Sequence, residues 1–208
     1  MTRLTLTDDE AAFIALRASG GWRAPLPTVQ GNSRPDVLQA VLRGRRSLAV
    51  RDLADSDGAP TGAAAEVLKR LGTGLRAFFL LADADDNWLS QGITVYLYGS
   101  SVGAVELSHV IAPAGVHYLR VAPPAGQWAA LTGLAEAIFA RGFAAGPADD
   151  ADGTRGAGVR SPAAALLHVV RPEGLRFIRV ARATVTTGRG PVPARFPSVP
   201  DAVSWLLA

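Results

Sequence analysis

The chain has 208 residues, of which 49% are hydrophobic and 19% charged, so it is long enough and apolar enough to fold around a core. Its formal net charge is only +3, and its basic residues are scattered arginines plus the single lysine Lys69, which argues against a dedicated nucleic-acid surface. It contains no cysteine, which excludes disulfides, thiolate metal sites and cysteine nucleophiles.

The start of the chain is acidic and does not resemble a secretory signal, because residues 8–10 read Asp-Asp-Glu. The longest strongly apolar run, 77–82, is far below the roughly 20 residues that a membrane-spanning helix requires. We therefore expect a soluble cytoplasmic protein without membrane insertion.

Helices dominate the first third of the chain. Residues 7–10, Thr-Asp-Asp-Glu, have the form of a capping box and begin a predicted helix that stops at 20–21, Gly-Gly. The stretch 22–33 contains prolines and glycines and is predicted to be a loop. A second helix is predicted from Pro35, with Gly44 ending or interrupting it, and a third over 61–71.

Strand patterns follow over 75–82, 93–98 and 102–111. Two segments, 109–121 and 168–180, then share His, Val, Pro, Gly, Arg and Val at matching positions, and each has an x-Pro-x-Gly turn between two apolar runs. We interpret them as a duplicated β-hairpin. The sequence does not determine the register of the first hairpin, that is, which residues of its two strands lie opposite one another.

The duplication predicts the architecture. A helix follows the first hairpin over 123–142, and a short helix from about 199 follows the second. We predict an α+β fold in which a central, mainly antiparallel sheet is flanked by helices. It is built from two pseudo-repeated halves, each ending in a hairpin and then a helix, at 1–143 and 162–208, with a linker at 144–161 and one shared sheet.

No pattern identifies a reaction. His109 and His168 occupy the same place in the two hairpins, which the duplication explains, and no carboxylate partner is identifiable by spacing. His117 lies across the hairpin from His109, and the two share a face only in one of the possible registers. No order of Ser, His and Asp indicates a catalytic triad. We predict no enzyme, no catalytic, cofactor-binding or metal-binding residue, and no cofactor.

Three aromatic residues are candidates for contact with a partner protein. Tyr96 and Tyr98 are two apart on a predicted strand and project to one face, and Trp88 lies in the preceding loop. If that face is uncovered, the three form a contact patch, whereas if it is covered, the tyrosines belong to the core. The linker at 144–161 is a second candidate for contact.

A DNA-binding regulator is the alternative function. Arg43, Arg45 and Arg46 end the second predicted helix, and three helices followed by strands would suit a winged helix. Against this, the third helix has basic residues only at its C-terminal end, Lys69 and Arg70, whereas recognition helices contact bases from their N-terminal residues. A nucleic-acid partner is therefore the less favoured one.

Several segments together resemble a known family. They are Leu-Thr-Asp-Asp-Glu at 6–10, Pro-Leu-Pro at 25–27, Leu-Arg-Gly at 42–44 leading to Asp-Gly at 57–58, and the duplicated layout. The chain is similar in these to the EspG family, cytosolic chaperones of actinobacterial type VII secretion, whose two related halves share a largely antiparallel sheet flanked by helical bundles. The resemblance implies a non-enzymatic adaptor that binds a helical secreted protein of the PE–PPE type, or a WXG100-like helical pair, and keeps it soluble. It does not define an oligomeric state.

Overall fold

The structure is a computed structural model, and it describes most of the chain. The described residues are 2–18, 22–29, 34–82, 94–112, 114–144, 164–171, 174–181, 184–187 and 195–208. Their helices are α1 (Asp8–Arg17), α2 (Arg34–Val50), α3 (Gly62–Leu71), α4 (Gln127–Ala144) and α5 (Val199–Leu207). Their strands are β1 (Arg3–Thr7), β2 (Leu75–Ala82), β3 (Thr94–Gly99), β4 (Val105–Ala112), β5 (Val116–Val121), β6 (Ala164–Arg171), β7 (Gly174–Ala181), β8 (Thr184–Thr187) and β9 (Arg195–Phe196).

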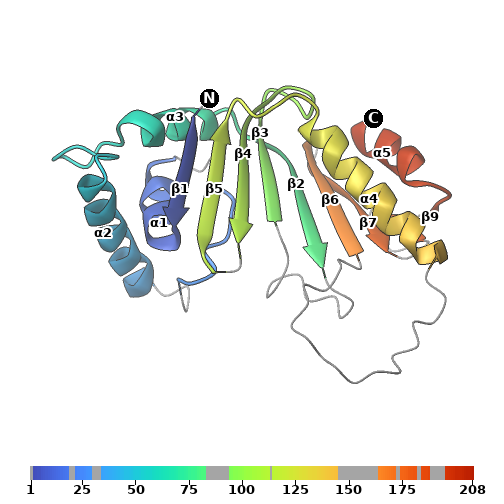
Figure 1. Ribbon diagram of the computed structural model, residues 1–208, viewed down its shortest axis with the longest axis horizontal. Helices are drawn as coiled ribbons and strands as arrows, with labels where there is room; N and C mark the ends of the chain where they lie inside the picture. The colour runs from blue at the N-terminus through green and yellow to red at the C-terminus, as the bar shows by residue number, and fades with distance from the viewer. Residues whose placement is uncertain are drawn as a thin grey trace, which may run out of the picture. The chain divides into compact units, whose positions relative to one another are not determined.

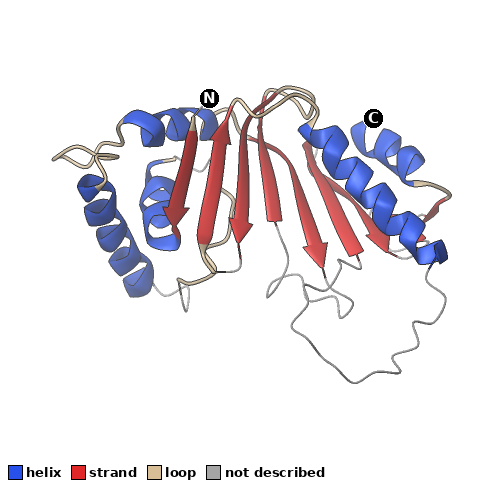
Figure 2. Cartoon of the chain, viewed as in Figure 1, coloured by secondary structure: helices blue, strands red, loops and turns tan. Residues whose placement is uncertain are grey.

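The nine described strands form one open antiparallel sheet in the order β1-β5-β4-β3-β2-β6-β7-β8-β9 (Figures 1 and 2). The predicted α+β class with an antiparallel sheet is therefore confirmed. The chain divides into two compact units, one of Met1–Phe78 with Ile93–Gln127 and the other of Phe79–Gly92 with Trp128–Ala208. The second unit thus includes nearly all of α4, which the sequence-based division assigned to the first half.

The first strand, β1, is not predicted by the sequence patterns. Leu4 and Leu6 are buried and alternate with exposed residues, as expected for a strand with one covered face. It pairs antiparallel with β5, where Leu6 lies opposite His117. The strand runs directly into the capping box of α1, so its short alternation was hidden by the stronger helix signal that follows it.

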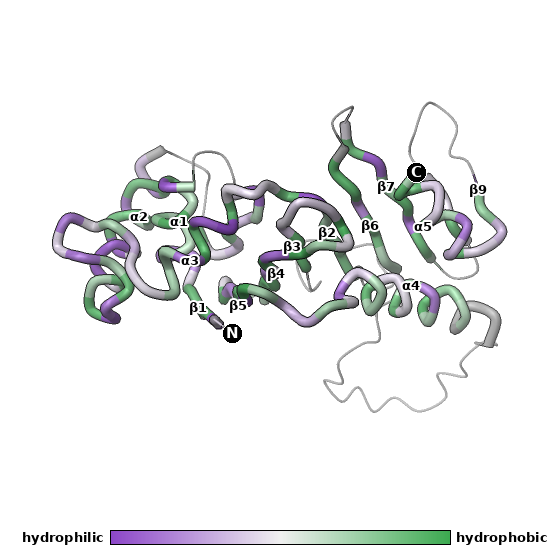
Figure 3. Tube along the Cα trace, turned by 90° about the horizontal axis from the view of Figure 1, so that it is seen from above, coloured by the Kyte–Doolittle hydropathy of each residue, from purple (hydrophilic) through white to green (hydrophobic). Residues whose placement is uncertain are grey.

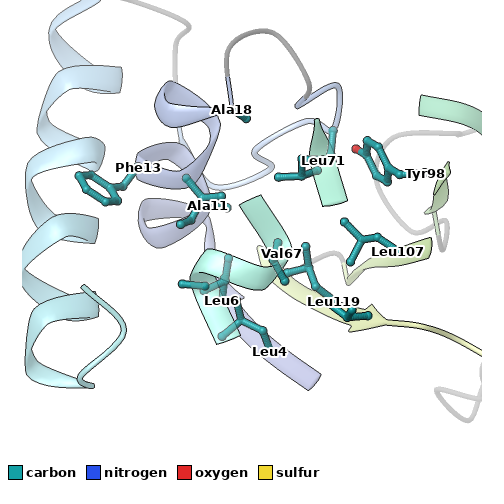
Figure 4. Close-up of a cluster of buried hydrophobic side chains, with 14 of the residues drawn as sticks. Leu4, Leu6, Ala11, Phe13, Ala18, Val67, Leu71, Tyr98, Leu107 and Leu119 are labelled. Carbon is teal, nitrogen blue, oxygen red and sulfur yellow. The ribbon is translucent and has the colours of Figure 1, made fainter. Parts of the chain in front are cut away.

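A single hydrophobic core holds the first unit together (Figure 4). α1 and α3 pack on the sheet, and the inward residues of β1, β3, β4 and β5 meet them. The side chains labelled in Figure 4 come from all of these elements: Leu4, Leu6, Ala11, Phe13, Ala18, Val67, Leu71, Tyr98, Leu107 and Leu119.

α2 packs against α1 rather than on the sheet, and it lies on the outer side of α1 (Figure 1). The helices approach closely at Gly44, where an added Cβ would lie 2.0 Å from the backbone oxygen of Asp9. The sequence marked Gly44 as the end or an interruption of the helix, but α2 continues to Val50. Gly44 is therefore a contact position inside the helix.

Both predicted hairpins form, as β4–β5 and β6–β7, but their registers differ by one residue. His109 lies opposite Leu119 in the first, whereas His168 lies opposite Phe177, the counterpart of Tyr118, in the second. The duplication inferred from the sequence is therefore not reproduced in the strand pairing.

The second unit contains a strand pair that the sequence patterns did not predict, β8 with β9. Its helix α5 packs on β6, β7 and β9, and the hydroxyl of Ser198 caps the helix by accepting a hydrogen bond from the Asp201 N–H. In Figure 3, β6 is coloured hydrophobic along most of its length, as expected for a strand buried within a sheet.

The helix contact at Gly44 yields a test of the α1–α2 packing. Gly44→Ala should lower the free energy of unfolding by about 2 kcal/mol or more, because the helices must separate to admit the methyl group. Gly133→Ala on α4 is the control, since its Cβ meets nothing within 4 Å and alanine favours helix. Urea denaturation of both variants measures the difference, and equal stabilities would contradict the close contact.

Candidate functional site

The register of the β4–β5 hairpin places two histidines on one face. His109 lies opposite Leu119, and His117 lies opposite Ile111, so the two histidines are diagonal neighbours on the covered side of the sheet. Their rings meet, with 2.8 Å between Nε2 of His109 and Nδ1 of His117. The question that the sequence left open is thus answered: the two share a face.

Asp8 completes a buried chain of polar groups. It is the first residue of α1, directly after β1, and its Oδ1 lies 2.6 Å from Nε2 of His117. Its other oxygen accepts hydrogen bonds from the backbone N–H and the hydroxyl of Thr28, the hydroxyl at 2.6 Å. We call Asp8, His117 and His109 the buried network. All three are at most 1% exposed.

The turn between β4 and β5 is shaped around this carboxylate. Gly115 has a φ of 72°, a left-handed conformation that glycine adopts without steric cost. A Cβ there would lie 2.6 Å from Oδ2 of Asp8 and 2.6 Å from the methyl group of Thr28. The glycine is therefore required both by the turn and by the space that Asp8 and Thr28 occupy.

The contacts and the burial together assign the protons of the network. Both rings are buried, which favours their neutral forms. A carboxylate only accepts hydrogen bonds, so in a neutral His117 Nε2 carries the hydrogen and Nδ1 accepts the Nε2–H of His109. Burial lowers the pKa of His109 well below its usual value, helped by repulsion from His117. Burial also lowers the pKa of His117, against the opposing effect of its hydrogen bond to Asp8.

Aromatic rings enclose the histidines. The ring centroid of Trp22 lies 4.8 Å from that of His109 and 5.5 Å from that of His117, and its indole N–H donates to the carbonyl of Ala24. Tyr96 approaches His109 from the neighbouring strand, at 5.8 Å between centroids. Nδ1 of His109 has no hydrogen-bond partner among the described residues. Both histidines are thus fully enclosed.

A second buried carboxylate belongs to Glu10, two residues after Asp8. It accepts from the backbone N–H of Thr7, from the Ser47 hydroxyl at 2.6 Å and from the Arg51 guanidinium at 2.7 Å. Arg51 also donates to the carbonyl of Thr5. The capping box predicted from the sequence is present, and its glutamate in addition fastens α2 to β1 and α1.

The structure places two of the three predicted contact residues in the core. Tyr96 is 7% exposed and Tyr98 is fully buried. Both tyrosines therefore belong to the core, which is the second of the two possibilities given by the sequence. Burial raises the pKa of Tyr96 to about 12 and raises that of Tyr98 as well. Trp88 lies outside the described residues, as does 145–161 of the linker. The tyrosines therefore do not form an exposed patch.

His168, the counterpart of His109 in the sequence repeat, belongs to the other unit. It lies in β6 of the second unit, stacked on Phe177 with 5.4 Å between ring centroids. Burial lowers its pKa to about 4, so the ring is neutral near pH 7. Each of the two repeated histidines is thus buried within its own unit.

The residues that sequence reasoning missed are Asp8, Thr28 and Trp22. Asp8 was recognised only as part of the capping box, and it lies 109 positions from His117 along the chain. The available signal was the clustering of polar residues beside apolar ones at 4–10 and 109–117, which identifies neither the partner nor the direction of either side chain.

The described residues contain no group of three or more histidine, cysteine or acidic side chains placed to hold a metal ion. In the buried network, the ring nitrogens and carboxylate oxygens are used for one another and for Thr28, apart from Nδ1 of His109. None of the described helices combines the length and apolar character that a membrane-spanning helix needs.

Comparison with known proteins does not assign a family. No protein-family model matches the chain, and no curated protein matches it. The structural class of the protein therefore rests on the structure alone, which is α+β with an open antiparallel sheet.

The first prediction for the site concerns Asp8. Asp8→Ala should lower the free energy of unfolding by about 3 kcal/mol or more, because three donors lose their acceptor and one of them, the ring N–H of His117, is fully buried. Asp9→Ala is the matched control, since the Asp9 side chain pairs with the exposed Arg43 at the surface and a much smaller loss is expected. Thermal and urea denaturation of both variants provide the comparison. Equal losses would show that the network does not stabilise the fold.

The second prediction concerns pH. The pKa values of His109, His117 and His168 are lowered in the folded state, so the unfolded chain binds more protons below pH about 6.5. Stability is full above that pH and falls as pH decreases, by up to about 1.4 kcal/mol per pH unit for each histidine that stays neutral in the folded protein. Urea denaturation between pH 7.5 and 5 measures the slope. His168→Leu should reduce it, and an unchanged slope would contradict the burial of that ring.

Proposed function

We propose that the protein is a non-enzymatic cytosolic chaperone or adaptor that binds helical substrates of type VII secretion, of the PE–PPE-like or WXG100-like kind. The proposal begins from the resemblance to the EspG family. The α+β fold with an antiparallel sheet and flanking helices is compatible with it.

One observation carries the proposal: the ionisable groups of the described core are turned inward, whereas apolar side chains are left exposed on a helix. Asp8, His109 and His117 form hydrogen bonds with one another away from solvent, which favours a structural role over catalysis. On α2, Leu38 and Leu42 are 50% and 48% exposed, one helical turn apart. An exposed apolar helix face is suited to binding another helix.

The proposal retains two pseudo-repeated halves, but the strands that correspond between the halves differ from those that the sequence repeat pairs. β2 to β5 followed by α4, and β6 to β9 followed by α5, have the same order of four strands and then a helix. This order supports two related halves. It matches β4–β5 with β8–β9, however, and not with the β6–β7 hairpin that the sequence repeat selects.

A pull-down tests the function. The tagged protein should recover a small helical secreted protein, or a pair of them, from an actinobacterial lysate at moderate salt, as identified by mass spectrometry. The bound material should resist nuclease treatment. Recovery of nuclease-sensitive material alone, with affinity for duplex DNA that falls steeply with salt, would instead support the DNA-binding alternative.

A further inference from the structure

The outer face of α2 carries a row of exposed residues at intervals of four, three and four positions. The row is Leu38, Leu42, Arg45 and Ala49. Intervals of three and four keep side chains on one face of a helix and are the spacing by which two helices pack along a seam. We call this the α2 row.

The α2 row faces away from the rest of the first unit. The opposite side of α2, with Ala40, Gly44 and Leu48 buried, is the side that packs on α1. α2 is the outermost helix of its unit in Figure 1. The described loop after α2 reaches the row at Arg45, and no described helix or strand of that unit other than α1 packs extensively on α2. Half-exposed leucines one turn apart on such a helix leave apolar area that a partner helix can bury.

The charge along the row selects the partner. Arg45 lies within the row and donates to the carbonyl of Ser56 at 3.1 Å, which holds its guanidinium beside the helix. Arg46 is exposed next to it and makes no ion pair with any residue that the structure describes. The row is therefore apolar at both ends with positive charge between, and it complements a helix with apolar residues at the same spacing and carboxylates beside them.

A second copy of this chain fits the row less well. A symmetric dimer through α2 would bring the same patch of both copies together, and the arginines of the two helices would lie near one another. Like charges in such an arrangement weaken association. Phosphates of a nucleic acid would leave the two leucines unmatched.

We propose that the α2 row is the docking site for an acidic amphipathic helix of a partner protein. This rests on the proposed function and adds the surface and the chemistry of the helix. The probe is a synthetic helical peptide about as long as α2, with leucines at alternating intervals of three and four and glutamates beside them. Its counterpart has lysine in place of each glutamate.

Fluorescence anisotropy with the full chain tests the docking site. At low ionic strength, the glutamate peptide should bind at least about tenfold more tightly than the lysine peptide. Leu42→Glu should weaken its binding by at least about tenfold. Leu175→Glu on β7, a leucine of similar exposure at 51%, should leave it unchanged. Arg46→Glu should move the preference toward the lysine peptide, a reversal that misfolding cannot produce.

Other outcomes overturn the proposal. Equal binding of the two peptides, absence of binding, or equal effects of Leu42→Glu and Leu175→Glu would each do so. If the wild-type chain is a dimer in sedimentation and Leu42→Glu makes it a monomer, the occupant of the row is a second copy instead.

The pull-down separates this proposal from the proposed function. If wild-type and Leu42→Glu baits recover the same helical partner equally, the chaperone function stands and the α2 row is not its site. If neither bait recovers a helical protein while the peptides behave as expected, the α2 row stands and the secretion function does not.

Discussion

The carboxylate of Asp8 is the group on which the arrangement of the first unit depends. A buried carboxylate is costly unless donors surround it, and here the donors come from distant parts of the chain. Thr28 supplies two of them from the segment after α1, and His117 supplies the third from β5. The start of α1, that segment and the β4–β5 hairpin must therefore take their positions together.

The acidic run at 8–10 serves three separate purposes within one turn of helix. Asp8 points into the core toward His117, Asp9 binds Arg43 at the surface, and Glu10 is buried under Arg51. All three also lie at the positive end of the α1 dipole, where acidic side chains are favourable. The residues that form a local capping signal in the sequence thus also connect α1 to β1, to α2 and to the sheet.

Periodicity predicted the elements with strong local signals and failed where the deciding contact was distant. The helices and both hairpins follow from spacing, capping and turn residues. β1 was missed because five alternating residues run into a stronger helix signal. Tyr96 and Tyr98 were assigned to one face correctly, but all six residues of β3 are buried, and a strand pattern does not say which faces are covered. The Asp8 partner of His117 depends on tertiary packing alone.

The same division between local and distant contacts bears on function. Asp8, His109 and His117 are buried and hydrogen-bonded to one another, and burial lowers the pKa values of both histidines. The exposed leucines of α2 have no comparable structural reason, since α2 is already fastened to α1 through Gly44 and to Glu10 through Ser47 and Arg51. A helix that is held on one side and exposes two leucines beside arginines on the other is better explained by a partner than by the fold, which is why recognition, and not catalysis, is the function that we favour.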